Sequence, residues 1–94
     1  MKTNDFPSEL FLPLLKQNAK LPQYAVLFRA FQQAILQGHL SAGAKLPASR
    51  PLSATLNVSR NTVKAAYEIL QAEGYIETRQ GSGSFVSGQV PDQS

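Results

Sequence analysis

The residues best equipped for chemistry form one short run, Ser59-Arg60-Asn61-Thr62, with Lys64 one turn beyond Arg60. A serine ahead of a helical pattern caps a helix, and the free N–H groups and positive dipole end of that helix can hold a phosphate. The hydroxyls of Ser59 and Thr62 can reach phosphate oxygens. Arg60 and Asn61 carry forked groups that match the edges of guanine and adenine, while Lys64 suits a base or the backbone. The run therefore indicates nucleic-acid binding, although it could also simply cap and solvate an exposed helix end.

Further candidates flank this run on both sides. Arg50 begins a shorter helix and is placed to anchor a DNA backbone, unless it is an ordinary surface arginine. The turn 80–83 is narrow and rich in glycine, so it can enter a minor groove, whose negative potential suits Arg79. Turn geometry alone would also explain those glycines. The predicted DNA-binding residues are Arg50, Ser59, Arg60, Asn61, Thr62, Lys64, Arg79, Gln80 and Gly81.

Three helices are expected to position these residues, because apolar side chains recur there at helical spacing. Their predicted ranges are 23–37, 50–56 and 60–73. Ser49 and Ser59 are the expected N-caps of the second and third helices. Gly38, Asn57 and Gly74 are expected to end the three helices in turn, since each tolerates a left-handed backbone.

A β-hairpin is expected directly after the third helix. Residues 75–79 and 84–86 alternate apolar and polar side chains, as half-buried strands do, and the turn 80–83 joins them. A three-helix core followed by a two-stranded wing is a winged helix-turn-helix. The predicted fold class is thus mainly α with a small β-hairpin.

The segments outside this core have a different character. Residues 1–20 are expected to form an N-terminal arm, of which residues 8–20 are partly extended, because Pro13 argues against one continuous helix. That arm is expected to lie against the body of the domain or against a second subunit. Residues 21–87 form the predicted domain, and residues 88–94 the start of a linker, because they are rich in serine, glycine, proline and glutamine.

Charge and composition narrow the functional classes. The 94 residues carry a net charge of +3, and no carboxylate occurs between Glu9 and Glu68. Such a basic tract favours a polyanionic partner, although a few lysines could also serve only solubility. No cysteine is present, which excludes disulfides and cysteine-bound zinc and fits a reducing, cytoplasmic setting. No apolar run suits a membrane span, so no membrane partner is expected. No acid–base pair or nucleophile with its base is visible, so an enzyme is not expected.

At the level of motifs, residues 21–87 resemble the winged-helix domain of GntR-type transcriptional regulators. The resemblance rests on Gly38-His39-Leu40, Leu46-Pro47, Val58-Ser59-Arg60, Glu73-Gly74-Tyr75-Ile76 and Gly81-Ser82-Gly83. It implies a bacterial regulator that binds a double-stranded DNA operator, usually as a homodimer on paired half-sites. The predicted function is sequence-specific binding, with helix 60–73 in the major groove and the wing tip 80–83 in the minor groove. The alternative is a winged helix that serves as a protein–protein or dimerisation module.

Within that group the chain is most similar to the MocR subfamily, through Arg60-Asn61-Thr62-Val63 and Ala65-Ala66-Tyr67. In that subfamily a linker and a pyridoxal-phosphate-binding domain, similar to an aminotransferase, follow the winged helix. The resemblance implies that this chain is the N-terminal domain of a larger regulator. No cofactor is then expected in this chain, pyridoxal phosphate is possible in a missing C-terminal domain, and the effector binds there.

Overall fold

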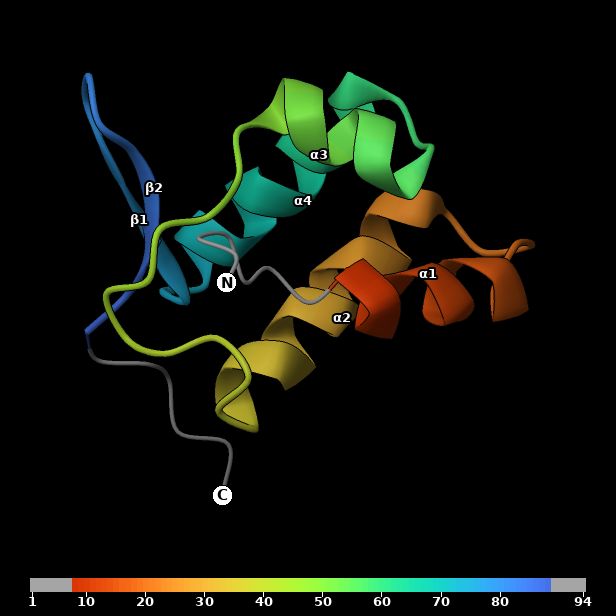
Figure 1. The fold of residues 1–94 in the computed structure, drawn as a ribbon, viewed down its shortest axis with the longest axis horizontal. Helices are drawn as coiled ribbons and strands as arrows, with labels where there is room; N and C mark the ends of the chain where they lie inside the picture. The colour runs from red at the N-terminus through yellow and green to blue at the C-terminus, as the bar shows by residue number, and fades with distance from the viewer. Residues whose placement is uncertain (1–7, 89–94) are drawn as a thin grey trace.

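A computed structural model of the chain describes residues 8–88. Its elements are α1 (Ser8–Gln17), α2 (Gln23–Leu36), α3 (Ser49–Leu56), α4 (Arg60–Ala72), β1 (Ile76–Arg79) and β2 (Gly83–Val86). The two strands pair antiparallel, with Ile76 opposite Val86 and Arg79 opposite Gly83. This arrangement confirms the predicted winged helix-turn-helix, with one helix more than expected (Figure 1). Residues 1–7 of the predicted arm and residues 89–94 of the predicted linker lie outside the described residues.

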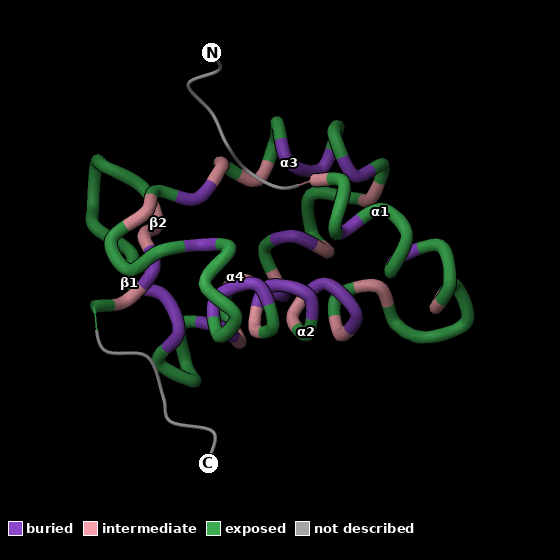
Figure 2. Tube along the Cα trace, turned by 60° about the horizontal axis from the view of Figure 1, so that its bottom comes forward, coloured by how far each residue is buried: buried purple, intermediate pink, exposed green. Residues whose placement is uncertain are grey.

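The core lies where α2 crosses α4, and both helices turn their buried faces toward it (Figure 2). Leu27 and Phe31 of α2 and Val63 and Leu70 of α4 have no exposed surface. Burying a side chain of this size contributes roughly 1.5–3 kcal/mol, so each of these contacts between α2 and α4 stabilises the domain. The helix that carries the predicted recognition residues is therefore held from behind by α2.

The turn between α3 and α4 forms as its sequence predicts. Asn57 ends α3 in the left-handed region, with φ of 59°, and its N–H donates to the Ser53 carbonyl. Asparagine is one of the few residues other than glycine that adopts this conformation at low cost. Val58 then packs against the core, partly buried, and Ser59 caps α4. The turn thus fixes the direction in which α4 leaves α3.

The N-terminal arm differs from its prediction, because residues 8–17 form a continuous helix with Pro13 inside it. The helix buries Phe11 and Leu15 in the core, and the Phe11 ring packs edge-on against Phe31 of α2 with centroids 4.8 Å apart. Burial of these two side chains contributes roughly 3–6 kcal/mol. A proline inside a helix costs about 3 kcal/mol, so burial outweighs the lost hydrogen bond.

One further prediction needs correction. Ser49 is the first residue of α3 rather than its cap; Ala48 takes the cap position and forms no side-chain cap bond. The connector between α2 and α3 pairs with the wing, since Lys45 forms a β-bridge with Phe85. The Leu46 N–H donates to the Ser84 carbonyl, and the Val86 N–H to the Ala44 carbonyl, each at 2.8 Å. The connector therefore lies along β2 and joins the wing to the helical core.

Candidate nucleic-acid interface

The N-terminus of α4 is built around two hydroxyl groups. Ser59 has an extended backbone, and its Oγ accepts a hydrogen bond of 3.1 Å from the Thr62 backbone N–H. The same Oγ lies 2.9 Å from the Thr62 Oγ1. The cap satisfies one of the free N–H groups of the helix, and the rest of the first turn keeps its positive end toward solvent. Capping is therefore the first role of Ser59, and the hydroxyl proton of the Ser59–Thr62 pair that is not used between the two oxygens is the donor available to a phosphate.

Behind this cap, α4 separates its polar and apolar residues cleanly. Val63 and Ala66 are buried against the core, whereas Arg60, Asn61 and Lys64 are exposed on the opposite side. Among the described residues, none of these three side chains takes part in a recorded hydrogen bond or ion pair. The structure thus brings together the predicted base-reading groups on one solvent-facing surface of one helix. A surface of forked and cationic groups at a helix N-terminus suits a nucleic acid groove.

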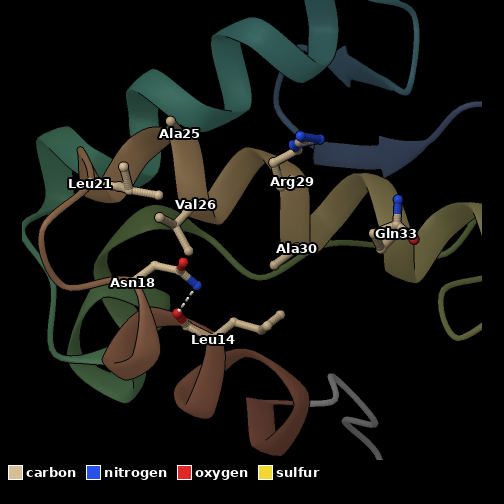
Figure 3. Close-up of a pocket in the computed structure, with 8 residues that line it drawn as sticks. All are labelled: Leu14, Asn18, Leu21, Ala25, Val26, Arg29, Ala30 and Gln33. Carbon is tan, nitrogen blue, oxygen red and sulfur yellow. Dashed lines mark hydrogen bonds between the residues drawn. The ribbon is translucent and has the colours of Figure 1, made fainter.

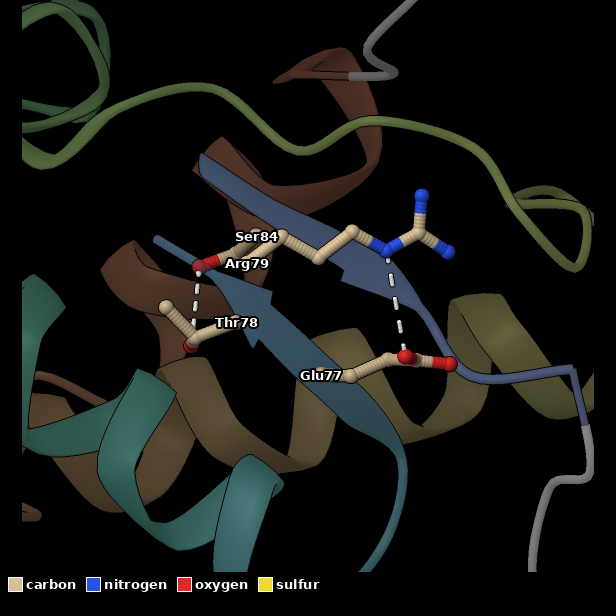
Figure 4. A network of polar contacts seen from close by, with 4 residues as sticks. All are labelled: Glu77, Thr78, Arg79 and Ser84. Atoms are coloured by element: carbon tan, nitrogen blue, oxygen red, sulfur yellow. Dashed lines mark hydrogen bonds and ion pairs between the residues drawn. The ribbon is translucent and has the colours of Figure 1, made fainter. Parts of the chain in front are cut away.

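The wing carries three of the predicted residues, and the side chain of one of them, Arg79, is restrained by two contacts. Arg79 lies with its guanidinium carbon 4.5 Å from the centroid of the Phe85 ring. Figure 4 shows its ion pair with Glu77, in which the Arg79 Nε is 3.9 Å from Glu77 Oε1. The adjoining turn contains Gln80 and Gly81, both exposed, and Gly81 has φ of 80°. The ring contact and the carboxylate together restrain Arg79 beside the tip of the wing.

Arg50 stands apart from α4, in the first turn of α3, with its side chain exposed. Its carbonyl accepts a hydrogen bond of 2.9 Å from Ser53 Oγ. In Figure 1, α3 and the tip of the wing lie along the same, upper edge of the molecule. The nine predicted residues therefore come from three neighbouring elements, with α4 contributing the largest group.

Between α4 and the wing lies an open cleft of about 420 Å³. Lys64, Glu68 and Gln71 form its helical side, and Thr78 and Ser84 its wing side. The Thr78 hydroxyl donates to Gln71 Oε1 at 2.9 Å, which ties the wing to α4. The connector lines the same cleft and brings Lys45 to the wing, a cation that the local sequence pattern does not place at the site.

A second concavity, of about 560 Å³, lies between α1 and α2 (Figure 3). Its eight lining residues are mostly aliphatic, and Asn18 among them donates to the Leu14 carbonyl at 2.8 Å. Arg29 is the one charged side chain in that lining, so the groove offers no acid–base pair. The described residues contain no cluster of three or more histidine, cysteine, aspartate or glutamate side chains that could hold a metal ion. Nor is any described helix long and apolar enough to span a membrane.

Comparison with known proteins decides the family. Residues 23–86 match the family described as bacterial regulatory proteins, gntR family. The chain belongs to the gntR family. Its relatives include the probable rhizopine catabolism regulatory protein MocR of Rhizobium meliloti, which is 43% identical over 79 residues; these cover 84% of this chain and 16% of that protein. This chain thus spans about one sixth of the length of that relative.

Solved structures of this gntR family give the same fold. YtrA from Sulfolobus acidocaldarius, a GntR-family transcription factor, is 32% identical with a TM-score of 0.72, covering 79% of this chain and 78% of that one. The DNA-binding domain of AraR, solved in complex with operator ORX1, is 33% identical with a TM-score of 0.67, covering 71% of this chain and 81% of that one. This gntR chain therefore shares its fold with a similar domain, that of AraR, which was solved in complex with operator DNA.

Proposed function

We propose that this gntR-family chain is a sequence-specific double-stranded DNA-binding module of a transcriptional regulator, and not an enzyme. The α4 helix lies in the major groove, where Arg60, Asn61 and Lys64 face the bases. Ser59 and Thr62 contact the backbone at the same helix end. The tip of the wing enters the adjacent minor groove with Arg79, Gln80 and Gly81, and Arg50 anchors a phosphate from α3. This partner implies a cytoplasmic location.

The observation that carries the proposal is the outward surface of α4. Arg60, Asn61 and Lys64 are exposed together, while the opposite face of the helix is buried without remaining surface at Val63 and Ala66. A helix held this firmly presents its outward groups in a fixed register, which base reading requires. Similarity to a domain solved on its operator supports the same partner.

Fluorescence anisotropy of the whole 94-residue chain on duplex DNA tests this proposal. Titrations at increasing salt should show an affinity that falls linearly on logarithmic axes, because each phosphate contact releases counterions. An unlabelled duplex whose sequence was enriched by selection from a random pool should compete better than a scrambled duplex of equal length. Lack of binding to any duplex, or binding that does not respond to salt, would contradict the proposal and favour the protein–protein module.

The rest of the regulator enters the proposal through its relatives. We infer that the active form is a homodimer on paired half-sites, joined through segments beyond residues 21–87, and that each isolated domain binds its half-site weakly. The effector, with pyridoxal phosphate as the candidate cofactor, belongs to a further domain. The described residues do not fit that cofactor, since all four of their lysines, 16, 20, 45 and 64, are exposed and none lies in a closed cavity where a Schiff base would be protected from water.

A further inference from the structure

Lys45 is held on the wing by strand pairing. Lys45 and Phe85 are directly opposite one another, and the two hydrogen bonds that flank them join Leu46 to Ser84 and Val86 to Ala44. Residues that face each other in this way carry their side chains on the same side of a sheet. The connector thus acts as a third, short strand, and it places the Lys45 side chain on the face of the wing that carries Phe85.

The wing's own register adds Arg79 to this face. Glu77 pairs with Phe85 and Arg79 with Gly83, so all of these positions share one side of the hairpin. The Arg79 guanidinium lies over the Phe85 ring, at 4.5 Å from its centroid. Lys45 and Arg79 therefore reach the same face of the wing from two separate segments, one on each side of Phe85.

Gly83 leaves room for the Lys45 stem. A Cβ at Gly83 would lie 3.2 Å from Lys45 Cε and 4.0 Å from Lys45 Nζ. The lysine stem thus passes diagonally across the wing at Gly83 and carries its ammonium toward the tip. Glu77 is the carboxylate on this face, and its recorded ion pair is with Arg79, at 3.9 Å. The Lys45 ammonium is exposed and has no recorded hydrogen bond or ion pair in residues 8–88.

We propose that Lys45 is a backbone contact of the wing, where its ammonium binds a phosphodiester that borders the minor groove. This inference rests on the proposed function. A wing inserted into the minor groove has a phosphate chain on either side, and an exposed cation on the face of the wing reaches one of those chains. Because a phosphate contact carries no base information, Lys45 contributes affinity without contributing sequence preference.

Replacing Lys45 by methionine tests this role, because methionine keeps an unbranched stem over Gly83 and removes the charge. The measured quantity is the slope of the logarithm of the DNA-binding constant against the logarithm of the salt concentration. We expect Lys45→Met to reduce the magnitude of this slope by about 0.9, the value of one phosphate contact. Affinity at about 0.15 M salt should fall roughly fivefold, by the same factor on a selected duplex and on a random-sequence duplex. Lys45→Arg should restore both the slope and the affinity.

Lys20→Met is the matched control, since Lys20 lies in the turn between α1 and α2, across the molecule from the wing (Figure 1). It should leave slope and affinity at the wild-type values, and thermal unfolding should confirm that all three variants are folded. An unchanged slope in Lys45→Met, or a loss confined to the selected duplex, would overturn the inference. A wild-type chain that binds no duplex at all would instead contradict the proposed function, so the two failures are distinguishable.

Discussion

At the scale of single residues, Ser59 carries two separable roles, because its Oγ both caps α4 and lies at the proposed phosphate contact. Ser59→Ala should lower the free energy of unfolding by about 1 kcal/mol, the usual value of a lost N-cap. Ser59→Asp should keep that stability, because aspartate also caps helices and complements the helix dipole. Its negative charge should nevertheless weaken DNA binding by about tenfold or more, since it faces a phosphate at close range.

Chemical denaturation and anisotropy titrations on the same preparations measure both effects. A Ser59→Asp variant that is stable and binds DNA as tightly as the wild type would show that no phosphate approaches this end of α4. Comparison with Ser59→Ala separates the lost hydroxyl from the added charge.

Glu77 gives a second prediction at this scale, because it is the carboxylate beside Arg79 on the wing. Both side chains are about half exposed, 49% for Glu77 and 56% for Arg79, so their ion pair contributes no more than about 1 kcal/mol to stability. Glu77→Gln should leave unfolding nearly unchanged. It should strengthen DNA binding by roughly two- to fivefold, because it removes a negative charge from a surface that approaches phosphates. Weaker binding in this variant would mean that Glu77 positions Arg79 for its contact.

At the scale of elements, Tyr67 joins α4 to the connector that leads into α3. Its hydroxyl donates to the Pro47 carbonyl at 2.7 Å, and its ring packs edge-on against Phe31 with centroids 5.4 Å apart. Burial of the hydroxyl raises the pKa of Tyr67 above its ordinary value near 10. The folded protein thus holds this proton more tightly than the unfolded chain does.

The sign of the resulting pH dependence follows from this raised pKa. The contribution of Tyr67 is fully present below pH 10, about the pKa of tyrosine in the unfolded chain, and is lost progressively as the pH rises above it. Tyr67→Phe should remove this alkaline loss and should lower stability near pH 7 by about 1 kcal/mol, the value of one hydrogen bond. Denaturant unfolding of both proteins at neutral and alkaline pH measures the difference. Parallel pH curves for the two proteins would contradict this account.

The elements also show how far local sequence patterns reach. The helical spacing of α2 and α4, the left-handed Asn57 and the glycine-tipped hairpin all depend on neighbours within a few residues, and each forms as predicted. The helix around Pro13 depends instead on the burial of Phe11 and Leu15 in the core, which local propensity does not encode. The bridge between Lys45 and Phe85 joins segments far apart in the chain, so no local signal places Lys45 on the wing.

The same distinction applies to the candidate site. The sequence pattern predicted that the run from Ser59 to Lys64 begins a capped helix with an outward face, because the cap and the face are local, periodic features of one helix. It did not predict that the Ser59 and Thr62 hydroxyls engage each other, nor that Arg79 is restrained by Phe85 and Glu77. Those contacts depend on side-chain geometry. The roles of the nine residues in DNA binding stay predictions.

At the scale of the whole molecule, the described cations divide between two regions. Five of the eight described lysine and arginine side chains belong to α3, α4 and the wing with its connector: Arg50, Arg60, Lys64, Arg79 and Lys45. The other three, Lys16, Lys20 and Arg29, lie on the α1–α2 side, next to the mostly aliphatic groove. A charged region attracts a polyanion over distances of about a Debye length, roughly 8–10 Å at moderate salt. Rigid attachment to the α2–α4 core then fixes how the outward face of α4 meets the bases. The central claim is therefore that Arg60 reads a base from this position.

Selection of binding sequences from a pool of random duplexes, with the wild type and with Arg60→Ala in parallel, tests that claim most directly. The wild type should enrich a short motif with a guanine at one position, since arginine pairs with guanine in a bidentate manner worth roughly 1–3 kcal/mol. Arg60→Ala should lose the preference at that position and keep the remainder of the motif. An identical motif from both proteins, or no enrichment by the wild type, would contradict the account.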